Sequence, residues 1–275
     1  MKRWSLSVLL IIFTTIRLQA AGADTISYPK LNKEYLKSYW HDSKALVISP
    51  AKWRGKHWIE FGAVTAVGVL AYTQDEKIQT YFVGHQNETA HNLSKFVFEP
   101  YGRFAPVIIG GLYIGGRLAK DNRLAGTSLI AAKSFVVASV SAGIVKQLTH
   151  RHRPFQDDLA NHANWDGPLS DIHYSSFPSG HSIAAYSMAT VYALEYRCTI
   201  WVPVLAYTLA TGTAVSRLYD NKHWASDVVI GSALGFVTGR FMWKQSRKGN
   251  NRLVLLPYVG SGTASLTFIV RLSEP

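Results

Sequence analysis

The chain has 275 residues, of which 48% are apolar, so it can bury a sizeable core in one large domain or two small ones. Its net charge of +12, from 29 basic and 17 acidic side chains, favours anionic partners. The sequence has neither a nucleic-acid-binding motif nor a basic helix interleaved with aromatic residues, so we expect no nucleic-acid partner. Cys198 is the only cysteine, which excludes an intrachain disulfide bond.

The first residues are typical of a secretion signal. Lys2 and Arg3 precede an apolar run, and small residues ending at Ala23 suit cleavage there. Arg17 interrupts the region before that position, which leaves an uncleaved membrane anchor as the alternative. We predict a signal peptide over residues 1–23, and therefore an exported protein in the periplasm or the cell-envelope membrane.

Apolar segments of helical length follow a polar start. We expect residues 24–99 to form helices and loops packed on a core over residues 100–245, with an amphipathic stretch at 75–100. The fold class is predicted to be all-α, a bundle of about six core helices. The expected helices cover residues 57–73, 104–118, 124–149, 181–196, 199–216 and 225–243.

The tail, residues 246–275, has a different pattern. Two apolar runs flank residues 260–262, Gly-Ser-Gly, which predicts strand, turn and strand. Two strands cannot close a membrane barrel, and an open sheet edge is not tolerated in lipid. We therefore expect a small C-terminal β-hairpin packed on the helical body.

The expected helices are short for membrane spans. A span needs about 20 consecutive apolar residues. The longest apolar run, residues 124–145, contains Lys133, and the other runs are shorter. We predict a helical bundle in the cell envelope that sits on or partly in the membrane. A fully polytopic membrane protein is the alternative.

The second half of the chain contains three clusters of basic and histidine residues. In the first, Lys146 and Arg153 are seven residues apart, so on a helix they project from one face. Pro154 disfavours helical geometry at Arg153, which places that arginine at a helix end. A basic helix end that meets the helix dipole is the alternative. His150 and His152 alternate with arginines that would repel a divalent metal, so no metal site is expected.

The second cluster is Pro178-Ser179-Gly180-His181, directly before an apolar helix. Ser179 suits the N-cap position, and Gly180 allows the backbone to approach a ligand closely. Free amides at a helix start bind phosphate, and His181 would stand at the mouth of this anion site. An ordinary capped helix with an incidental histidine is the alternative.

The third cluster runs from Ser216 and Arg217 to Asp227. His223 and Asp227 are four residues apart, hence neighbours on one helical face. A carboxylate beside an imidazole fixes its tautomer and raises its basicity. Arg217 would supply a planar fork for two phosphate oxygens. A surface histidine–aspartate pair is the alternative.

Spacing joins the three clusters. The 34 residues from 182 to 215 suffice for two antiparallel helices of about 24 Å each. This hairpin returns the chain to its starting end and puts Arg217 beside His181. Residues 155–177 are too many for a tight connection and suit a lid or specificity loop. Together the clusters predict one site that binds a tetrahedral oxyanion and moves it onto a nucleophile.

The three ordered motifs resemble those of the type 2 phosphatidic acid phosphatase superfamily, which includes bacterial class A acid phosphatases and vanadium haloperoxidases. The resemblance covers residues 100–243, and it implies that His223 is a nucleophile forming a phosphohistidine. Asp227 would orient His223, and His181 would protonate the leaving alcohol. The remaining positions would hold the phosphoryl oxygens: Lys146, Arg153, Ser179, Gly180 and Arg217.

The predicted function is that of a phosphatase without metal or other cofactor. The expected substrate is a phosphorylated lipid or an isoprenoid pyrophosphate, with a membrane surface as partner. A periplasmic acid phosphatase for small soluble esters and a vanadium-dependent haloperoxidase are alternative enzymes. A binding protein for phosphorylated lipids is the non-enzymatic alternative, although binding alone needs no oriented nucleophile. A nucleophile that must be neutral and an acid that must be protonated predict a bell-shaped pH profile.

Overall fold

The structure is a computed structural model, and it describes residues 27–157, 159–168, 170, 175–248, 254–260 and 263–269. The first helices are α2 (Lys33–Ile48), the short turn η1 (Ser49–Lys52), α3 (Gly55–Thr73) and α4 (Asp75–Gly84). The next are α5 (Glu88–Leu93), the π-helix η2 (Ser94–Phe98), α6 (Glu99–Arg103) and α7 (Ala105–Leu118). The long helices α8 (Asn122–Thr149), α9 (Gly180–Glu195), α10 (Trp201–Tyr219) and α11 (Ala225–Lys248) follow.

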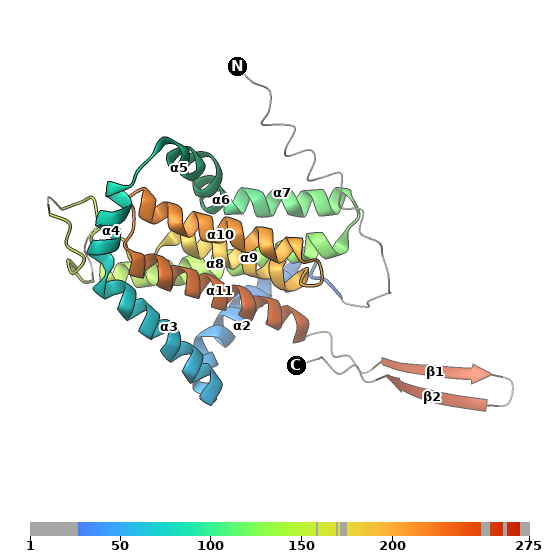
Figure 1. The fold of residues 1–275 in the computed structure, drawn as a ribbon. Helices are drawn as coiled ribbons and strands as arrows, with labels where there is room; N and C mark the ends of the chain where they lie inside the picture. Colours follow the sequence, from blue (N-terminus) through green and yellow to red (C-terminus); the bar gives the residue numbers. More distant parts are fainter. Residues whose placement is uncertain are drawn as a thin grey trace, which may run out of the picture.

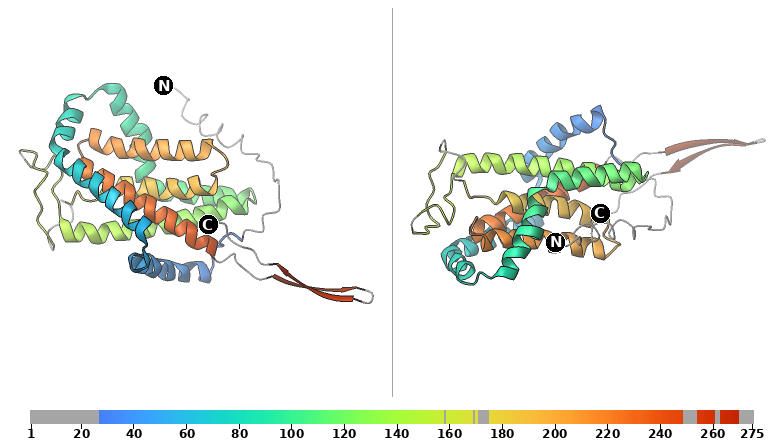
Figure 2. Two further views of the ribbon diagram at one scale, coloured as in Figure 1. Left: turned by 60° about the horizontal axis from the view of Figure 1, so that its bottom comes forward. Right: turned by 90° about the horizontal axis from the view of Figure 1, so that it is seen from above.

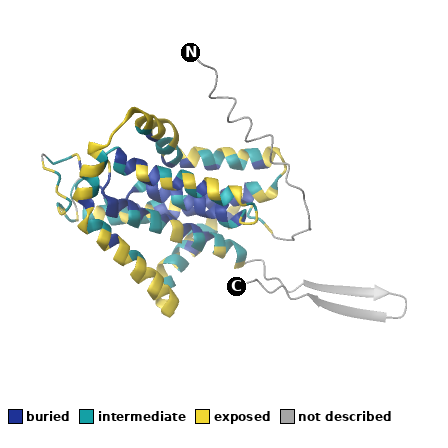
Figure 3. Cartoon of the chain, in the orientation of Figure 1, coloured by how far each residue is buried: buried dark blue, intermediate teal, exposed yellow. Residues whose placement is uncertain are grey.

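Helix α9 lies at the centre of the body, packed against α8, α10 and α11. Figure 3 shows the buried residues concentrated along these helices, whereas α3 is largely exposed. Glycines set the separation of α9 and α11, since a Cβ on Gly235 would lie 2.6 Å from the carbonyl oxygen of Ile183. Gly231 and Gly239, one turn away on either side, face the same helix. The two helices therefore approach backbone to backbone.

The outer helices complete the body around this centre. Helix α7 packs on α8, while α2 and α3 pack against α11 (Figures 1 and 2). All six predicted core helices are present within a few residues of their expected bounds, as α3 and α7 to α11. The all-α prediction is therefore confirmed for the body of the protein.

The N-terminal region is more helical than expected. Helix α2 has 16 residues, and Asn32 caps it by accepting a hydrogen bond from the Tyr35 amide at 2.9 Å. Asp42 on α2 forms a buried ion pair with Lys133 on α8, with Nζ and Oδ2 2.6 Å apart. The charge of Lys133, which interrupts the longest apolar run, is therefore neutralised by the carboxylate of Asp42 in the N-terminal region.

Among the described helices, α8 alone is long and apolar enough to cross a membrane by length and composition. Half of its most apolar window, 50%, is buried in the protein, and a buried core helix meets the same criterion. Large apolar side chains are nevertheless exposed on other helices, including Ile59 and Leu70 of α3, Val107 of α7 and Trp201 of α10.

The sequence predicts two features near the chain ends, a C-terminal hairpin and a signal peptide. Strands β1 (Val254–Gly260) and β2 (Thr263–Ile269) pair antiparallel. The packing of this hairpin on the helices stays a prediction. The predicted signal peptide, residues 1–23, lies outside the described residues.

Candidate active site

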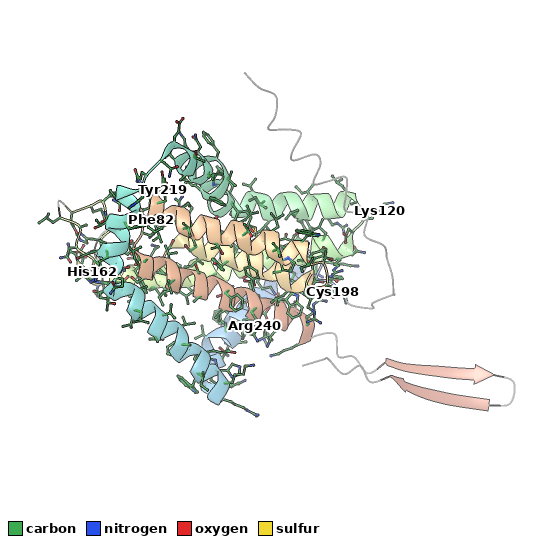
Figure 4. All side chains as sticks on the ribbon, in the orientation of Figure 1. Phe82, Lys120, His162, Cys198, Tyr219 and Arg240 are labelled. Carbon is green, nitrogen blue, oxygen red and sulfur yellow. The ribbon has the colours of Figure 1, made fainter. Side chains whose placement is uncertain are left out.

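The three sequence clusters meet at one end of the bundle because the long helices alternate in direction. Helices α8 and α10 end there, and α9 and α11 begin there (Figure 1). Figure 4 places His162 and Tyr219 at this end and Cys198 at the opposite end. The predicted return of the chain through α9 and α10 is confirmed.

The first cluster lies at and beyond the end of α8. The helix ends at Thr149, and His150 caps it with a left-handed backbone (φ 41°). Arg153 therefore lies beyond the helix and, contrary to what the seven-residue spacing predicted, does not share a helical face with Lys146. Lys146 Nζ donates to the carbonyl oxygens of Ser175 and Ser176 at 2.9 and 3.3 Å. Neither cation forms an ion pair with a carboxylate among the described residues, so both charges remain available to a ligand.

The second cluster forms the start of α9, as expected. Ser179 is the buried N-cap residue, but its Oγ accepts from Ser182 Oγ at 2.9 Å instead of capping an amide. A Cβ built on Gly180 would meet no atom within 4 Å, so space lies in front of this turn. His181 Nε2 is buried without a hydrogen-bond partner among the described residues, which points to a ligand as its partner.

Arg217, in the last turn of α10, is buried and held by acidic and hydroxyl groups. Its Nη2 donates to Asp220 Oδ2 at 2.8 Å and lies 3.8 Å from Glu99 Oε2. Nε and Nη2 also donate to Ser216 Oγ at 3.1 and 3.0 Å. Within the described part of the chain Nη1 has no such bond, so one side of the guanidinium is left for an anion.

His223 and Asp227 are linked through a third residue. His223 precedes α11, so it does not share a helical face with Asp227, contrary to the prediction. Its Nδ1 lies 3.8 Å from Asp227 Oδ2, which is too far for a hydrogen bond. Ser176 Oγ bridges them, 3.2 Å from His223 Nδ1 and 2.5 Å from Asp227 Oδ2. A hydroxyl has one proton, which the carboxylate requires, so His223 Nδ1–H is the donor to Ser176. The neutral imidazole therefore carries its lone pair on Nε2.

The pKa values of the cations respond to burial and to one another. Burial, with a smaller effect of Arg153, lowers the pKa of Lys146 to about 8. Burial also lowers the pKa of Arg153 and of Arg217, although nearby carboxylates oppose the shift. The cations thus share a poorly hydrated space in which an anion would be strongly attracted.

The pKa values of both histidines are lowered, which keeps the rings neutral, and the pKa of Asp227 is lowered, which keeps its carboxylate charged. Burial, with smaller contributions from Lys146 and Arg153 and against the influence of Asp227, lowers the pKa of His223 to about 4. Burial, then Arg217 and His223, lowers the pKa of His181 to about 3. Burial raises the pKa of Asp227, but its interactions with His223, with Arg151 and with Ser176 leave it lowered.

Sequence reasoning missed three members of this site. Ser176 bridges His223 and Asp227, and Arg151 donates to Asp227 Oδ1 at 2.5 Å. Asp75, at the start of α4, binds Arg151 from the other side at 2.7 Å. The only signal for Arg151 was its place within the first cluster; Asp75 lies 76 residues from it, so no local pattern connects them.

The arrangement combines an oriented imidazole and a carboxylate relay with Lys146 and Arg153, which form no ion pair among the described residues. It suits transfer of an anionic group to His223 Nε2. The structure brings together every residue predicted for the site, while their individual roles stay predictions. No group of three histidine, cysteine or acidic residues that could hold a metal ion occurs in the described ranges.

Comparison with known proteins identifies relatives of this chain. The sequence profile of the PAP2 superfamily matches residues 126–251. The lipid A 1-phosphatase of Porphyromonas gingivalis is 46% identical over 66 residues, 24% of this chain and 15% of that protein. The decaprenylphosphoryl-5-phosphoribose phosphatase of Mycobacterium tuberculosis is 30% identical over 152 residues, 55% of this chain and 75% of that protein.

The shared length differs among these relatives. The chain spans far less than two thirds of the P. gingivalis protein but three quarters of the mycobacterial one. The crystal structure of Aquifex aeolicus LpxE aligns with a TM-score of 0.45 at 19% identity, covering 62% of this chain and 94% of that one.

Proposed function

This chain belongs to the PAP2 superfamily, and we propose that it is a phosphatase that hydrolyses the phosphate of a lipid or isoprenoid through a phosphohistidine at His223. The observation that carries the proposal is the His223–Ser176–Asp227 relay beside Lys146 and Arg153, two cations that form no ion pair with a carboxylate among the described residues. A protein that only bound phosphate would need the cations but not an oriented imidazole.

The first step is attack by His223 Nε2 on phosphorus. The relay holds Nδ1–H against Ser176 Oγ, so Nε2 carries the lone pair, and the P–N bond forms as the P–O bond to the leaving alcohol breaks. The positive charge that develops on the ring is balanced by Asp227. A water molecule then hydrolyses the phosphohistidine and releases inorganic phosphate and free His223.

The phosphoryl oxygens would be held by Lys146, Arg153, Arg217 and the amides at the start of α9. Phosphoryl transfer depends mainly on positioning and on stabilising charge on the equatorial oxygens. Arg153 Nε is buried without a hydrogen-bond partner among the described residues, and a phosphate oxygen would satisfy it. Gly180 leaves the space that the phosphate needs.

His181 would donate the proton to the leaving oxygen. In the unliganded site its pKa is low because burial and neighbouring cations disfavour the charged ring. A phosphate dianion offsets those cations, so binding of the substrate would raise the pKa of His181 and supply the acid. The buried, unpartnered Nε2 is the atom expected to face the leaving oxygen.

The substrates of the relatives and the exposed apolar side chains on the surface support a lipid substrate. Relatives include phosphatases of lipid A and of decaprenylphosphoryl-5-phosphoribose. Ile59 and Leu70 of α3 and Trp201 of α10 are between 65% and 77% exposed, and a bilayer would cover them. We place the protein at the cell-envelope membrane with its site outside the cytoplasm.

The deciding experiment compares wild type and His223→Ala on a panel of lipid phosphates, isoprenoid pyrophosphates and p-nitrophenyl phosphate. We expect wild type to release phosphate fastest from a lipid substrate and the variant to lose at least about a thousandfold in kcat. A phosphohistidine trapped by rapid acid-free quenching in wild type, and absent from the variant, would identify the intermediate.

Three results would contradict the proposal. Phosphate release that survives His223→Ala would exclude the mechanism, and preference for small soluble esters would exclude the lipid substrate. Halide oxidation with added vanadate, without phosphate release, would indicate a haloperoxidase. The matched control is His85→Ala, since His85 is an exposed histidine directly after α4, and this variant should retain full activity.

A further inference from the structure

Arg151 is a fully buried cation between two fully buried carboxylates. Its Nη1 donates to Asp227 Oδ1 at 2.5 Å, and its Nη2 donates to Asp75 Oδ2 at 2.7 Å. The side chains of all three residues are 0% exposed. A buried charge is expensive unless it is paired, so this cluster fixes all three groups in one arrangement.

The plane of the guanidinium is fixed as well. The rings of Tyr72, Trp165 and Trp224 lie 5.0, 4.9 and 5.5 Å from its central carbon. Nε and Nη2 also donate to the carbonyl oxygen of His162 at 3.0 and 2.9 Å. A flat fork among aromatic faces suits arginine, and the ammonium group of a lysine could not reproduce these directed bonds.

Asp75 also ties α4 to the start of α11. Its Oδ1 accepts from the Ser226 amide at 2.9 Å, and its Oδ2 accepts from Ser226 Oγ at 2.5 Å. A carboxylate at a helix N-terminus satisfies amides that have no partner within the helix. Because Ser226 directly precedes Asp227, Asp75 positions the backbone that carries the carboxylate of the relay.

We propose that Arg151 and Asp75 are positioning residues for the proposed hydrolysis, which hold Asp227 so that its Oδ2 faces Ser176 and His223. Arg151 takes up Oδ1 and leaves Oδ2 to the relay. Asp75 offsets the charge of Arg151, so the cluster keeps one negative charge opposite the imidazole. Without Asp75, Arg151 would neutralise Asp227 and weaken its support of the positive ring.

The charge balance predicts opposite effects of the two residues on His223. The other titratable or charged groups around His223 are Lys146 in the last turn of α8, Arg153 after that helix, His181 on α9 and Asp227 on α11. These stay in place in the tests below. Asp75→Asn removes a negative charge and should lower the pKa of His223, whereas Arg151→Gln removes a positive charge and should raise it.

The test is the pH dependence of kcat/KM for p-nitrophenyl phosphate, whose acidic limb would report the free-enzyme pKa of His223. We expect kcat to fall about 10- to 100-fold in both variants, as for other residues that orient a functional side chain through hydrogen bonds, and KM to change less than about threefold. We expect the limb to move by about one pH unit, downward in Asp75→Asn and upward in Arg151→Gln. Arg151→Lys keeps the charge but not the fork, so kcat should fall while the limb stays.

Glu76→Gln is the matched control, since Glu76 follows Asp75 on α4 but its side chain is half exposed and pairs, among the described residues, with His162 and not with Arg151 or Asp227. Limbs that stay in place, shifts in the same direction, or kcat within threefold of wild type would overturn the proposal. If Arg151→Gln does not fold by circular dichroism, Asp75→Asn and Arg151→Lys decide. An inactive wild type would instead refute the proposed function on which this inference rests.

Discussion

Two buried carboxylates at opposite ends of the bundle use similar partners for different purposes. Glu195, at the end of α9 near Cys198 (Figure 4), accepts hydrogen bonds from Tyr28 at 2.8 Å and Trp243 at 2.9 Å. It also pairs with Arg123 at 3.2 Å and with Arg247. Both arginines end on this carboxylate, so the cluster joins the start of α8 and the end of α11 to α9.

Asp227 organises its surroundings differently. It takes one arginine, Arg151, and one hydroxyl, Ser176, while Lys146 and Arg153 nearby form no ion pair with a described carboxylate. A half-buried cation without a counter-ion decreases the free energy of unfolding, and a bound anion restores it. Unpaired cations, rather than buried charges as such, therefore distinguish a candidate site from a structural cluster.

The largest expected effect is that of Asp227→Asn. The amide cannot balance the positive charge that develops on His223, so kcat should fall by about 10³- to 10⁴-fold. Steady-state kinetics on the preferred substrate measures this change, and phosphate affinity should persist because the binding cations are untouched. Activity within tenfold of wild type would make Asp227 a structural carboxylate like Glu195.

Arg153→Ala should have the next largest effect. Removal of one donor to a developing oxyanion costs about 10²- to 10³-fold in kcat/KM. The melting temperature should stay or rise, since Arg153 has no ion pair with a described carboxylate to lose. Arg117→Ala, an exposed arginine on α7, is the charge-matched control and should leave kcat/KM unchanged. Equal losses in both variants would indicate a long-range charge effect.

The pH profile is expected to change activity by about tenfold per pH unit outside its plateau. Below a pKa of about 4, His223 becomes protonated and loses its lone pair, so kcat/KM falls as the pH decreases. Above a pKa of about 8, Lys146 loses its charge, so kcat/KM falls as the pH increases. A profile of kcat/KM between pH 3 and 10 checks both limbs, and Lys146→Arg should move only the alkaline one.

Glu195→Gln should have the smallest effect on activity. The variant weakens hydrogen bonds to charged arginines, each of which contributes about 1.5 to 3 kcal/mol, so the free energy of unfolding should decrease by that order. Urea denaturation measures the loss, and kcat of the folded enzyme should remain within about twofold of wild type. A large fall in kcat would show that the two ends are coupled.

The sequence allowed the core helices and the clusters to be predicted because both depend on local patterns. Apolar length marked α7 to α11, and the motif residues lie within short segments that helix direction brings together. The roles of Ser176, Arg151 and Asp75 could not be predicted because they depend on contacts between segments that are distant in the sequence. Ser226 and Asp75, for example, are 151 residues apart. The His223–Asp227 spacing suggested a helical pair, but α11 begins only at Ala225.

The order of the site residues along the sequence gives the last helix of the bundle a separate importance. Lys146, Arg153 and Arg217 all precede His223, and Asp227 comes after it. A chain that stops at residue 222 would retain the proposed anion-binding cations but lack the proposed nucleophile and its carboxylate. Truncation before α11 would therefore abolish the proposed hydrolysis, whatever phosphate binding remained.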